Sequence, residues 1–215
     1  MIFPCPHRRW LGELCGGKTV LDTFCYSGGF SVSAVKGGAS HVTAVDSSEP
    51  ALSLAKRNME LNGVAESVSF EQADVLDYLL RASKEGKTFD IVILDPPKLA
   101  PSRKDLDRAK GKYKKLQKAG LACVTPGGLL VTCTCSSAMA QNDELLPVIR
   151  AAASGDDPIC PQPPFAIFYS FDHTSRQTNK QTNKQVHTHT CKQYMFTHTQ
   201  NFDIWPPIID LFWLA

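Results

Sequence analysis

The chain has no long apolar run and no recognisable export signal. No stretch approaches the ~18 consecutive apolar residues that a membrane-spanning helix requires. The first ten residues, MIFPCPHRRW, lack the ordered charged, apolar and cleavage regions of a secretory signal. We therefore expect no membrane partner and, by default, a cytosolic location, with an organelle matrix as the alternative.

Metal-binding patterns are missing as well. The sequence holds eight cysteines, but Cys133 and Cys135 are separated by a single residue, whereas zinc knuckles use a gap of about two to four residues. No pair of histidines or cysteines follows them at a suitable spacing. We expect reduced thiols and no bound metal.

An overall excess of charge is also lacking, since the formal net charge is +2. The charge is uneven, however, because residues 102–118 carry eight Lys/Arg against two Asp. Leu106, Ala109, Tyr113 and Leu116 fall at helical spacing, which predicts a helix with one core-facing side and one basic side. The basic side is either simply solvated or contacts nucleic-acid phosphates, and Tyr113 is either a core or a base-stacking residue.

Size and composition fit a single globular domain. With 215 residues and 43% hydrophobic residues, the chain is long enough for one α/β domain with a full core.

Two hydrophobic runs end in residues suited to chemistry. Residues 89–94 are almost continuously apolar, as expected of a parallel strand buried on both faces, and Asp95-Pro96-Pro97 ends that strand. Residues 129–134 repeat the pattern after the turn Pro126-Gly127-Gly128. The carboxyl ends of parallel strands form the edge at which open α/β sheets bind ligands. We therefore expect a site where these two strands end.

A thiol follows the second strand. Cys133 and Cys135 are two positions apart, so they share a face of an extended strand, with Cys135 nearer the open edge. A strand-end cysteine is usually a small buried hydrophobe, and we interpret Cys133 in this way. Cys25 is expected to line a turn.

Upstream, the segment VLDTFCYSGGFS (20–31) predicts a strand, a glycine turn and a helix from about Phe30. Gly28 and Gly29 would let the backbone approach a ligand closely. The next strand ends on Asp46, 18 residues beyond Gly28, where an acidic side chain commonly accepts hydrogen bonds from a ribose diol. Asp74 follows a third strand and either meets an adenine edge or caps the next helix.

In this order the motifs resemble the catalytic domain of class I S-adenosylmethionine (SAM)-dependent methyltransferases, closest to the branch that forms 5-methylcytosine in large-subunit ribosomal RNA. The resemblance covers roughly residues 17–152. It implies an α/β fold with a Rossmann-like, doubly wound, mostly parallel sheet. It also implies SAM as cofactor and RNA, specifically ribosomal RNA, as partner.

The resemblance also implies roles for individual residues. The methionine part of the cofactor would be cradled by Asp22, Phe24, Ser27, Gly28 and Gly29. Asp46 and Ser47 would hold the ribose, Asp74 and Val75 the adenine. Asp95 would border the cofactor and face the target base, and Cys135 matches the nucleophile of the branch.

The chemistry of cytosine agrees with this assignment. Carbon 5 is a poor nucleophile until a thiolate adds at carbon 6, so a cysteine is required. A thiol with a pKa near ~8.5 is only about 3% ionised at neutral pH, so positioning must contribute more than ionisation. Asp95 could hydrogen-bond an extruded base, and Lys98 could meet the phosphate or the base.

The pattern changes near residue 152. Beyond it come Pro-Gln-Pro-Pro, the repeat QTNKQTNKQ (177–185) and alternating His-Thr (187–190). AAAC and CA tracts encode such residues, so translated non-coding DNA and a genuine low-complexity tail are the two explanations. The expected organisation is a short leader (1–16), the methyltransferase domain (17–152) and a disordered, irregular tail (153–215).

The sheet is accordingly expected to be incomplete. Residues 141–152 can supply the helix after the fifth strand, but only 165–171 reads as a further strand, so we expect no C-terminal hairpin. The apolar cluster 204–215 is expected to remain an exposed patch. The leader is too short for the RNA-binding domain and extra strands of relatives, so the sequence reads as truncated at both ends.

Three further functions compete with cytosine methylation. The first is methylation of another base such as guanine, and the second is a truncated cofactor-binding module without turnover. A nicotinamide dehydrogenase is a distant third, because Asp95-Pro96-Pro97-Lys98 and the thiol strand would then have no role.

Overall fold

The computed structural model describes residues 6–100, 103–136, 139, 144–153, 165–178 and 185–198. The helices in these ranges are α1 (Pro6–Leu14), α2 (Gly29–Lys36), α3 (Glu49–Asn62), α4 (Val75–Lys84), α5 (Leu106–Leu121) and α7 (Leu145–Ala153), with short 3-10 turns at Ala65–Ser67 and Arg103–Asp105. The strands are β1 (Thr19–Thr23), β2 (His41–Asp46), β3 (Val68–Gln72), β4 (Phe89–Leu94), β5 (Val124–Thr134), β6 (Phe165–Thr178) and β7 (Gln185–His198).

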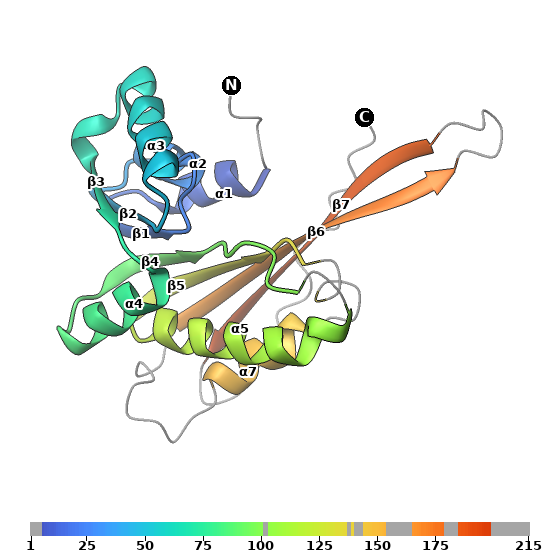
Figure 1. The fold of residues 1–215 in the computed structure, drawn as a ribbon. Helices are drawn as coiled ribbons and strands as arrows, with labels where there is room; N and C mark the ends of the chain where they lie inside the picture. Colours follow the sequence, from blue (N-terminus) through green and yellow to red (C-terminus); the bar gives the residue numbers. More distant parts are fainter. Residues whose placement is uncertain are drawn as a thin grey trace.

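The strands form one sheet in the order β3-β2-β1-β4-β5-β6-β7. All neighbouring pairs are parallel except β6 and β7, which are antiparallel. Figure 1 shows α1, α2 and α3 on one face and α4, α5 and α7 on the other. The predicted doubly wound, mostly parallel α/β sheet is confirmed. The strand order reverses between β1 and β4, the position at which such sheets bind ligands.

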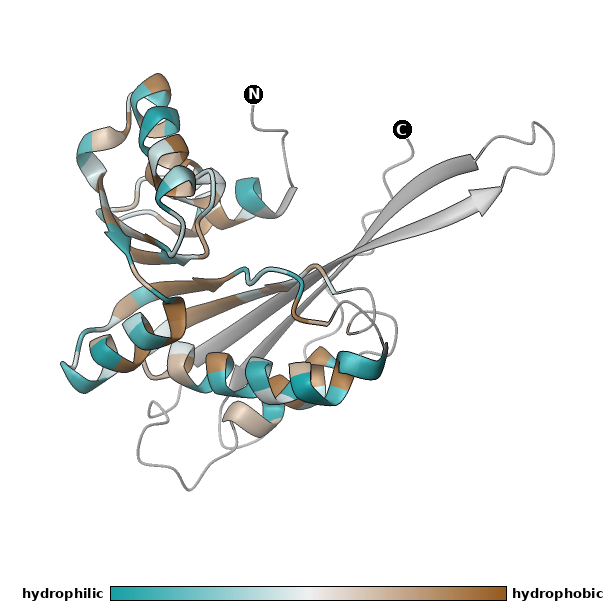
Figure 2. Cartoon of the chain, in the orientation of Figure 1, coloured by the Kyte–Doolittle hydropathy of each residue, from teal (hydrophilic) through white to brown (hydrophobic). Residues whose placement is uncertain are grey.

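Burial on both faces explains the continuous apolar runs. Successive strand residues point to opposite faces, so Val20 and Ile93 join one core cluster while Leu21 and Leu94 join the other. All four side chains are fully buried. Figure 2 shows the resulting hydrophobic colouring along β4 and the mixed faces of the flanking helices.

Residues 6–16 of the predicted leader pack against the rest of the domain. Leu11 of α1 is fully buried, as is Cys15 just beyond it, and α1 lies against α2. The contact is close because it joins two glycines: a Cβ atom on Gly37 would lie 1.9 Å from the carbonyl oxygen of Gly12. Helix α1 therefore packs together with residues that follow the predicted boundary at residue 17.

The C-terminal region differs from expectation. Residues 165–178 and 185–198 form an antiparallel hairpin, and its first strand pairs in parallel with residues 129–134 of β5. The predictions of a missing hairpin and an irregular, disordered tail are wrong over these two segments. The apolar cluster 204–215 lies outside the described residues.

The physical reason lies in the residues that we read as low complexity. Thr, Val, Tyr and Phe favour extended backbone, and a local antiparallel hairpin costs little loop-closure entropy. The edge of β5 offers a row of unpaired backbone N–H and C=O groups, which β6 satisfies. Repetition in the sequence therefore did not preclude regular pairing.

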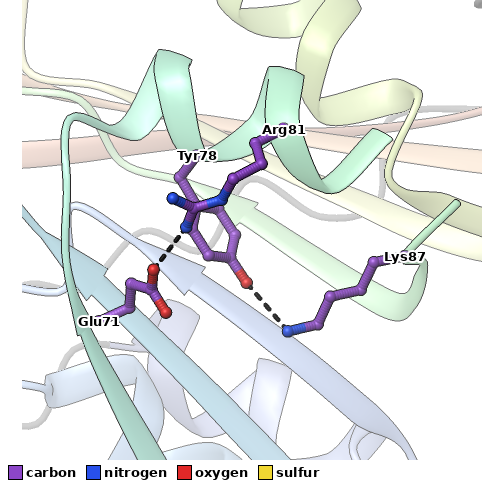
Figure 3. A network of polar contacts seen from close by, with 4 residues as sticks. All are labelled: Glu71, Tyr78, Arg81 and Lys87. Carbon is purple, nitrogen blue, oxygen red and sulfur yellow. Dashed lines mark hydrogen bonds and ion pairs between the residues drawn. The ribbon is translucent and has the colours of Figure 1, made fainter. Parts of the chain in front are cut away.

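A polar network ties α4 to the sheet (Figure 3). Arg81 forms an ion pair with Glu71 of β3 and lies over the ring of Tyr78. Lys87 donates a 3.4 Å hydrogen bond to the Tyr78 hydroxyl. Burial is the main cause of a raised pKa at Tyr78. The network joins β3, α4 and the residues that lead into β4.

Candidate functional site

The loop between β1 and α2 holds unusual backbone conformations. Phe24 and Tyr26 have φ angles of 56° and 46°, and Gly28 has a φ of 72°. Left-handed φ angles at residues other than glycine cost roughly 1–3 kcal/mol and occur preferentially at functional sites. The glycine turn predicted from the sequence is therefore a strained loop at the carboxyl end of β1.

Gly28 lies close against α3 in addition to having a left-handed backbone. A Cβ atom at this position would lie 2.4 Å from Cε of Met59 and 3.2 Å from Cβ of Ala55, both on α3. The neighbouring carbonyl oxygen of Ser27 accepts a 2.8 Å hydrogen bond from the side chain of Asn58. The loop is thus held against α3 and its shape is preset.

Asp22 lies beneath this loop and is 1% exposed. One of its oxygens, Oδ2, accepts hydrogen bonds from the amide and the hydroxyl of Ser31, at 3.0 and 2.6 Å. The other, Oδ1, is buried without a partner. Burial, with a contribution from the charge of Asp95, raises the pKa of Asp22 to about 7. An unpaired buried carboxylate oxygen is costly and indicates a missing cationic or hydrogen-bonding partner.

Arg8 is a site residue that the sequence reasoning missed. Its guanidinium lies over the ring of Phe30 at 5.5 Å, and a Cβ atom on Gly29 would be 2.6 Å from its Cζ. Its Nε is buried without a partner, and its charge acts to lower the pKa of Asp22. Two side chains of opposite charge, each with one buried polar atom that lacks a partner, therefore lie beside the glycine turn. The only sequence signal was an arginine pair in the segment that we read as a leader.

Asp46 is the last residue of β2, and both oxygens of its carboxylate accept hydrogen bonds. Its Oδ2 accepts a 3.0 Å hydrogen bond from the amide of Tyr26, and its Oδ1 accepts one of 2.9 Å from Ser48. Each carboxylate oxygen retains a second lone pair, which is the acceptor that a ribose diol needs. Ser47 is exposed beside it.

Asp74 is the N-cap of α4. Its side chain accepts hydrogen bonds from the amides of Leu76 and Asp77, so of our two interpretations capping is confirmed. Adenine contact stays a prediction for the same residue, which is exposed. Val75 is 2% exposed, so its side chain serves the core, and its backbone amide, unsatisfied within the helix, is the group available to a ligand.

The strand-end carboxylate and thiol lie on adjacent strands. Leu94 pairs with Thr132, so Asp95 follows at the level of Cys133, and Cys135 lies just beyond the end of β5. Cys133 packs partly against the core, whereas Cys135 is exposed. Their difference in burial agrees with the different roles that we predicted.

Three further residues considered in the sequence analysis are Lys98, Cys25 and Tyr113. Lys98 is exposed beyond the prolines. Cys25 is buried, as a lining residue should be, and burial raises the pKa of its thiol. Tyr113 is fully buried, which confirms the core interpretation and makes the base-stacking one wrong. No cluster of three potential metal ligands and no helix able to cross a membrane occurs in the part of the chain that the structure describes.

The family model of the S-adenosylmethionine-dependent methyltransferases matches residues 5–156. The chain belongs to this family. The match begins upstream of α1, in agreement with the packing of that helix as part of the domain.

The chain is also similar to individual named proteins. This methyltransferase chain is 46% identical, over 133 residues, to the ribosomal RNA large subunit methyltransferase I of Photobacterium profundum, covering 61% of the chain and 34% of that protein. It is 41% identical, over 148 residues, to the protein of the same name from Shewanella frigidimarina, covering 68% and 37%. The chain thus spans about a third of the length of these relatives.

Solved structures agree on the fold. A Streptococcus mutans protein described as a SAM-dependent methyltransferase superposes with a TM-score of 0.62 at 29% identity, covering 71% of this chain and 39% of that one. A methyltransferase structure described as a complex with S-adenosylhomocysteine (SAH) gives the same TM-score and identity, covering 71% and 40%.

The methyltransferase domain fits the cofactor of its family. The amino-acid part of SAM carries an ammonium and a carboxylate, which are complementary to the two buried atoms without a partner, Oδ1 of Asp22 and Nε of Arg8. Gly28 keeps the intervening turn free of side chain. Asp46 presents acceptors at the next strand end, where a ribose would follow.

Proposed function

We propose that this chain carries the catalytic domain of an RNA methyltransferase that forms 5-methylcytosine in large-subunit ribosomal RNA through a covalent adduct with Cys135. The observation that supports the proposal most is the exposed thiol of Cys135 just beyond β5, one strand away from Asp95. The glycine turn occupies the same sheet edge, so a base held at the thiol would also be near a cofactor in the turn.

The cofactor would be held along three successive strand ends. Asp22, Gly28 and Gly29, with Phe24 and Ser27 in the same loop, would bind its methionine part. Asp46 and Ser47 would take the ribose. Asp74 and the backbone of Val75 would meet the adenine. When bound, SAM supplies an electrophilic methyl group on a sulfonium.

The chain's own contribution is addition and elimination on the base. The thiolate of Cys135 adds to carbon 6 of cytosine, which places an electron pair at carbon 5. That carbon would take the methyl group as its bond to the sulfonium sulfur of SAM breaks, leaving SAH, and would then lose its proton to water while the S–C6 bond breaks and the thiolate returns. A protonated carboxyl group at Asp95 would donate a hydrogen bond to the ring nitrogen, where negative charge develops, and its other oxygen would accept one from the amino group.

RNA binding would use the exposed side of α5. Its buried side confirms the predicted stripe, since Ala109, Tyr113 and Leu116 are all in the core. Lys112 and Lys115 are exposed on the other side. Helix α5 follows the loop that contains Lys98, so phosphates on either side of the target base would meet these cations.

A mechanism-based trap tests the proposal. RNA from the large subunit with 5-fluorocytidine in place of cytidine should form a covalent complex with the wild-type chain in the presence of SAM, because fluorine blocks the elimination step. Cys135→Ser should abolish both the adduct and methylation and leave SAM affinity within about twofold. Cys133→Ser is the matched control and should retain both.

Two results would contradict the proposal. Full methylation by the Cys135→Ser chain would remove the nucleophile and favour another base. Binding of SAM without adduct or turnover in the wild type would leave a cofactor-binding module.

A further inference from the structure

Two buried side-chain hydrogen bonds join α5 to β5, and we call each of them a rung. Gln117 donates from Nε2 to Oγ1 of Thr132 at 2.6 Å, and the hydroxyl of Tyr113 lies 2.7 Å from Oγ1 of Thr134. The helix residues are one turn apart and the threonines two strand positions apart. The rungs differ in what lies next to them: the Thr132 rung is inside the strand, and the Thr134 rung is at its end, directly before Cys135.

The Tyr113 rung continues around the cysteine. Tyr113 is fully buried, and its hydroxyl also lies 3.5 Å from Oγ of Ser136. The amide of Ser136 donates a 3.1 Å hydrogen bond to Oγ1 of Thr134. One phenol thus contacts the residues on both sides of Cys135, and the hydroxyls draw the backbone into a tight turn.

The same network reaches the loop after Asp95. The backbone amide of Ala100 donates a 3.2 Å hydrogen bond to Oγ of Ser136. Both Cys135 and Asp95 lie close enough for their charges to act on the pKa of Tyr113, although burial is the main cause of its rise. The phenol therefore stays protonated at neutral pH and remains a hydrogen-bond donor.

We propose that Tyr113 is a positioning residue for Cys135: its hydroxyl, through Thr134 and Ser136, fixes the direction of the thiol and its distance from the loop of Asp95. This inference rests on the proposed function in that the thiol is the nucleophile. Cys135 and Ser136 directly follow Thr134, the residue of β5 in the last printed pair with β6, so the hydroxyl network lies where the strand ends. Addition to a base requires near-attack geometry, which a shift of about 1 Å destroys.

A purely structural role would not require the hydroxyl. Phenylalanine fills the same space in a core, and a buried hydroxyl is unfavourable unless it is hydrogen-bonded. Here the hydroxyl is satisfied by the two side chains that flank the thiol.

The test compares two variants that each remove one rung. Tyr113→Phe should lower kcat for RNA methylation by roughly 10- to 100-fold while the KM for RNA and the Kd for SAH change less than about twofold. Thr132→Val removes the other rung and should leave kcat within about twofold at a similar loss of stability. Thr134→Ser keeps the hydroxyl and should retain a kcat near that of the wild type. Thr134→Val removes the hydroxyl and should lower kcat as Tyr113→Phe does.

A second measurement does not depend on RNA. Amide hydrogen exchange of the peptide containing residues 133–136 should accelerate at least ~10-fold in Tyr113→Phe and remain unchanged in Thr132→Val. If the wild type neither methylates nor traps RNA, the proposed function fails, and this exchange difference still decides whether the network holds the cysteine turn. Equal exchange in the two variants, or equal losses of kcat, would overturn the proposal.

Discussion

Ser31 binds a single oxygen of Asp22 with two donors, its amide at 3.0 Å and its hydroxyl at 2.6 Å. The second oxygen is left buried and unpaired. Burial raises the pKa of the carboxyl to about 7, although both hydrogen bonds from Ser31 oppose the rise. The domain therefore keeps a partly unsatisfied carboxylate at the carboxyl end of β1, where a cationic ligand group would satisfy it.

The first prediction concerns stability and pH. The folded pKa of Asp22, about 7, lies above the ordinary value of 3.8, so the folded chain holds a proton that the unfolded chain has lost between these values. Stability should therefore fall as pH rises from about 4 to 7. Asp22→Asn removes this dependence. Its free energy of unfolding relative to wild type should therefore rise with pH, by on the order of 1 kcal/mol at pH 5 and about 4 kcal/mol at pH 8. Thermal melts across this range measure the difference, and a constant gap would contradict it.

The second prediction concerns Arg8 and the amino-acid part of the cofactor. Arg8→Ala should weaken SAH binding by roughly 10- to 100-fold, because a charge-assisted hydrogen bond to the carboxylate is lost. Binding of 5′-methylthioadenosine, which lacks that carboxylate, should change less than about twofold. Calorimetry with both ligands measures this, with Arg9→Ala, on the exposed side of α1, as the control. Equal losses for both ligands would assign Arg8 a structural role.

The third prediction separates backbone strain from crowding at Gly28. Gly86 has a φ of 70° and open space where a Cβ would lie, whereas Gly28 has a φ of 72° and its Cβ would meet Met59 at 2.4 Å. Both alanine variants should lose about 1 kcal/mol from the left-handed backbone. Gly28→Ala should lose roughly 1–3 kcal/mol more from overpacking, and it alone should weaken SAH binding. Denaturant melts and calorimetry check this. Identical losses of stability in the two variants would show that the Met59 side chain moves aside at no cost.

The fourth prediction reverses our expectation for the tail. Deleting residues 155–215 removes β6 and exposes the backbone edge of β5 over residues 129–134. The shortened chain should melt several degrees lower and aggregate more readily, because an unpaired central strand becomes an edge. Scanning calorimetry and light scattering measure both effects. A truncated chain with unchanged melting and solubility would show that the hairpin adds no stability.

The site was predictable where a strand end carries its own signal. The strand ending at Leu94 was predicted with its observed bounds, Asp46 is the last residue of β2 as expected, and the glycine turn follows β1. Such positions are legible because burial on both faces imposes a continuous apolar run, and the ligand edge begins where that run stops. The sequence did not predict how β4 and β5 pair. The structure has an irregularity between the pairs Phe89–Val124 and Ile91–Leu129, and the predicted turn at residues 126–128 lies within β5.

Local sequence therefore determined the elements, the chemistry available at their ends and the family resemblance, because these depend on short-range periodicity and on residue type. Tertiary structure alone decided three other features. It brought Arg8 across to the glycine turn, it buried Tyr113 against the residues that flank Cys135, and it paired β6 with β5. Each of these joins segments far apart along the chain, and their contacts arise from packing, on which no local pattern reports.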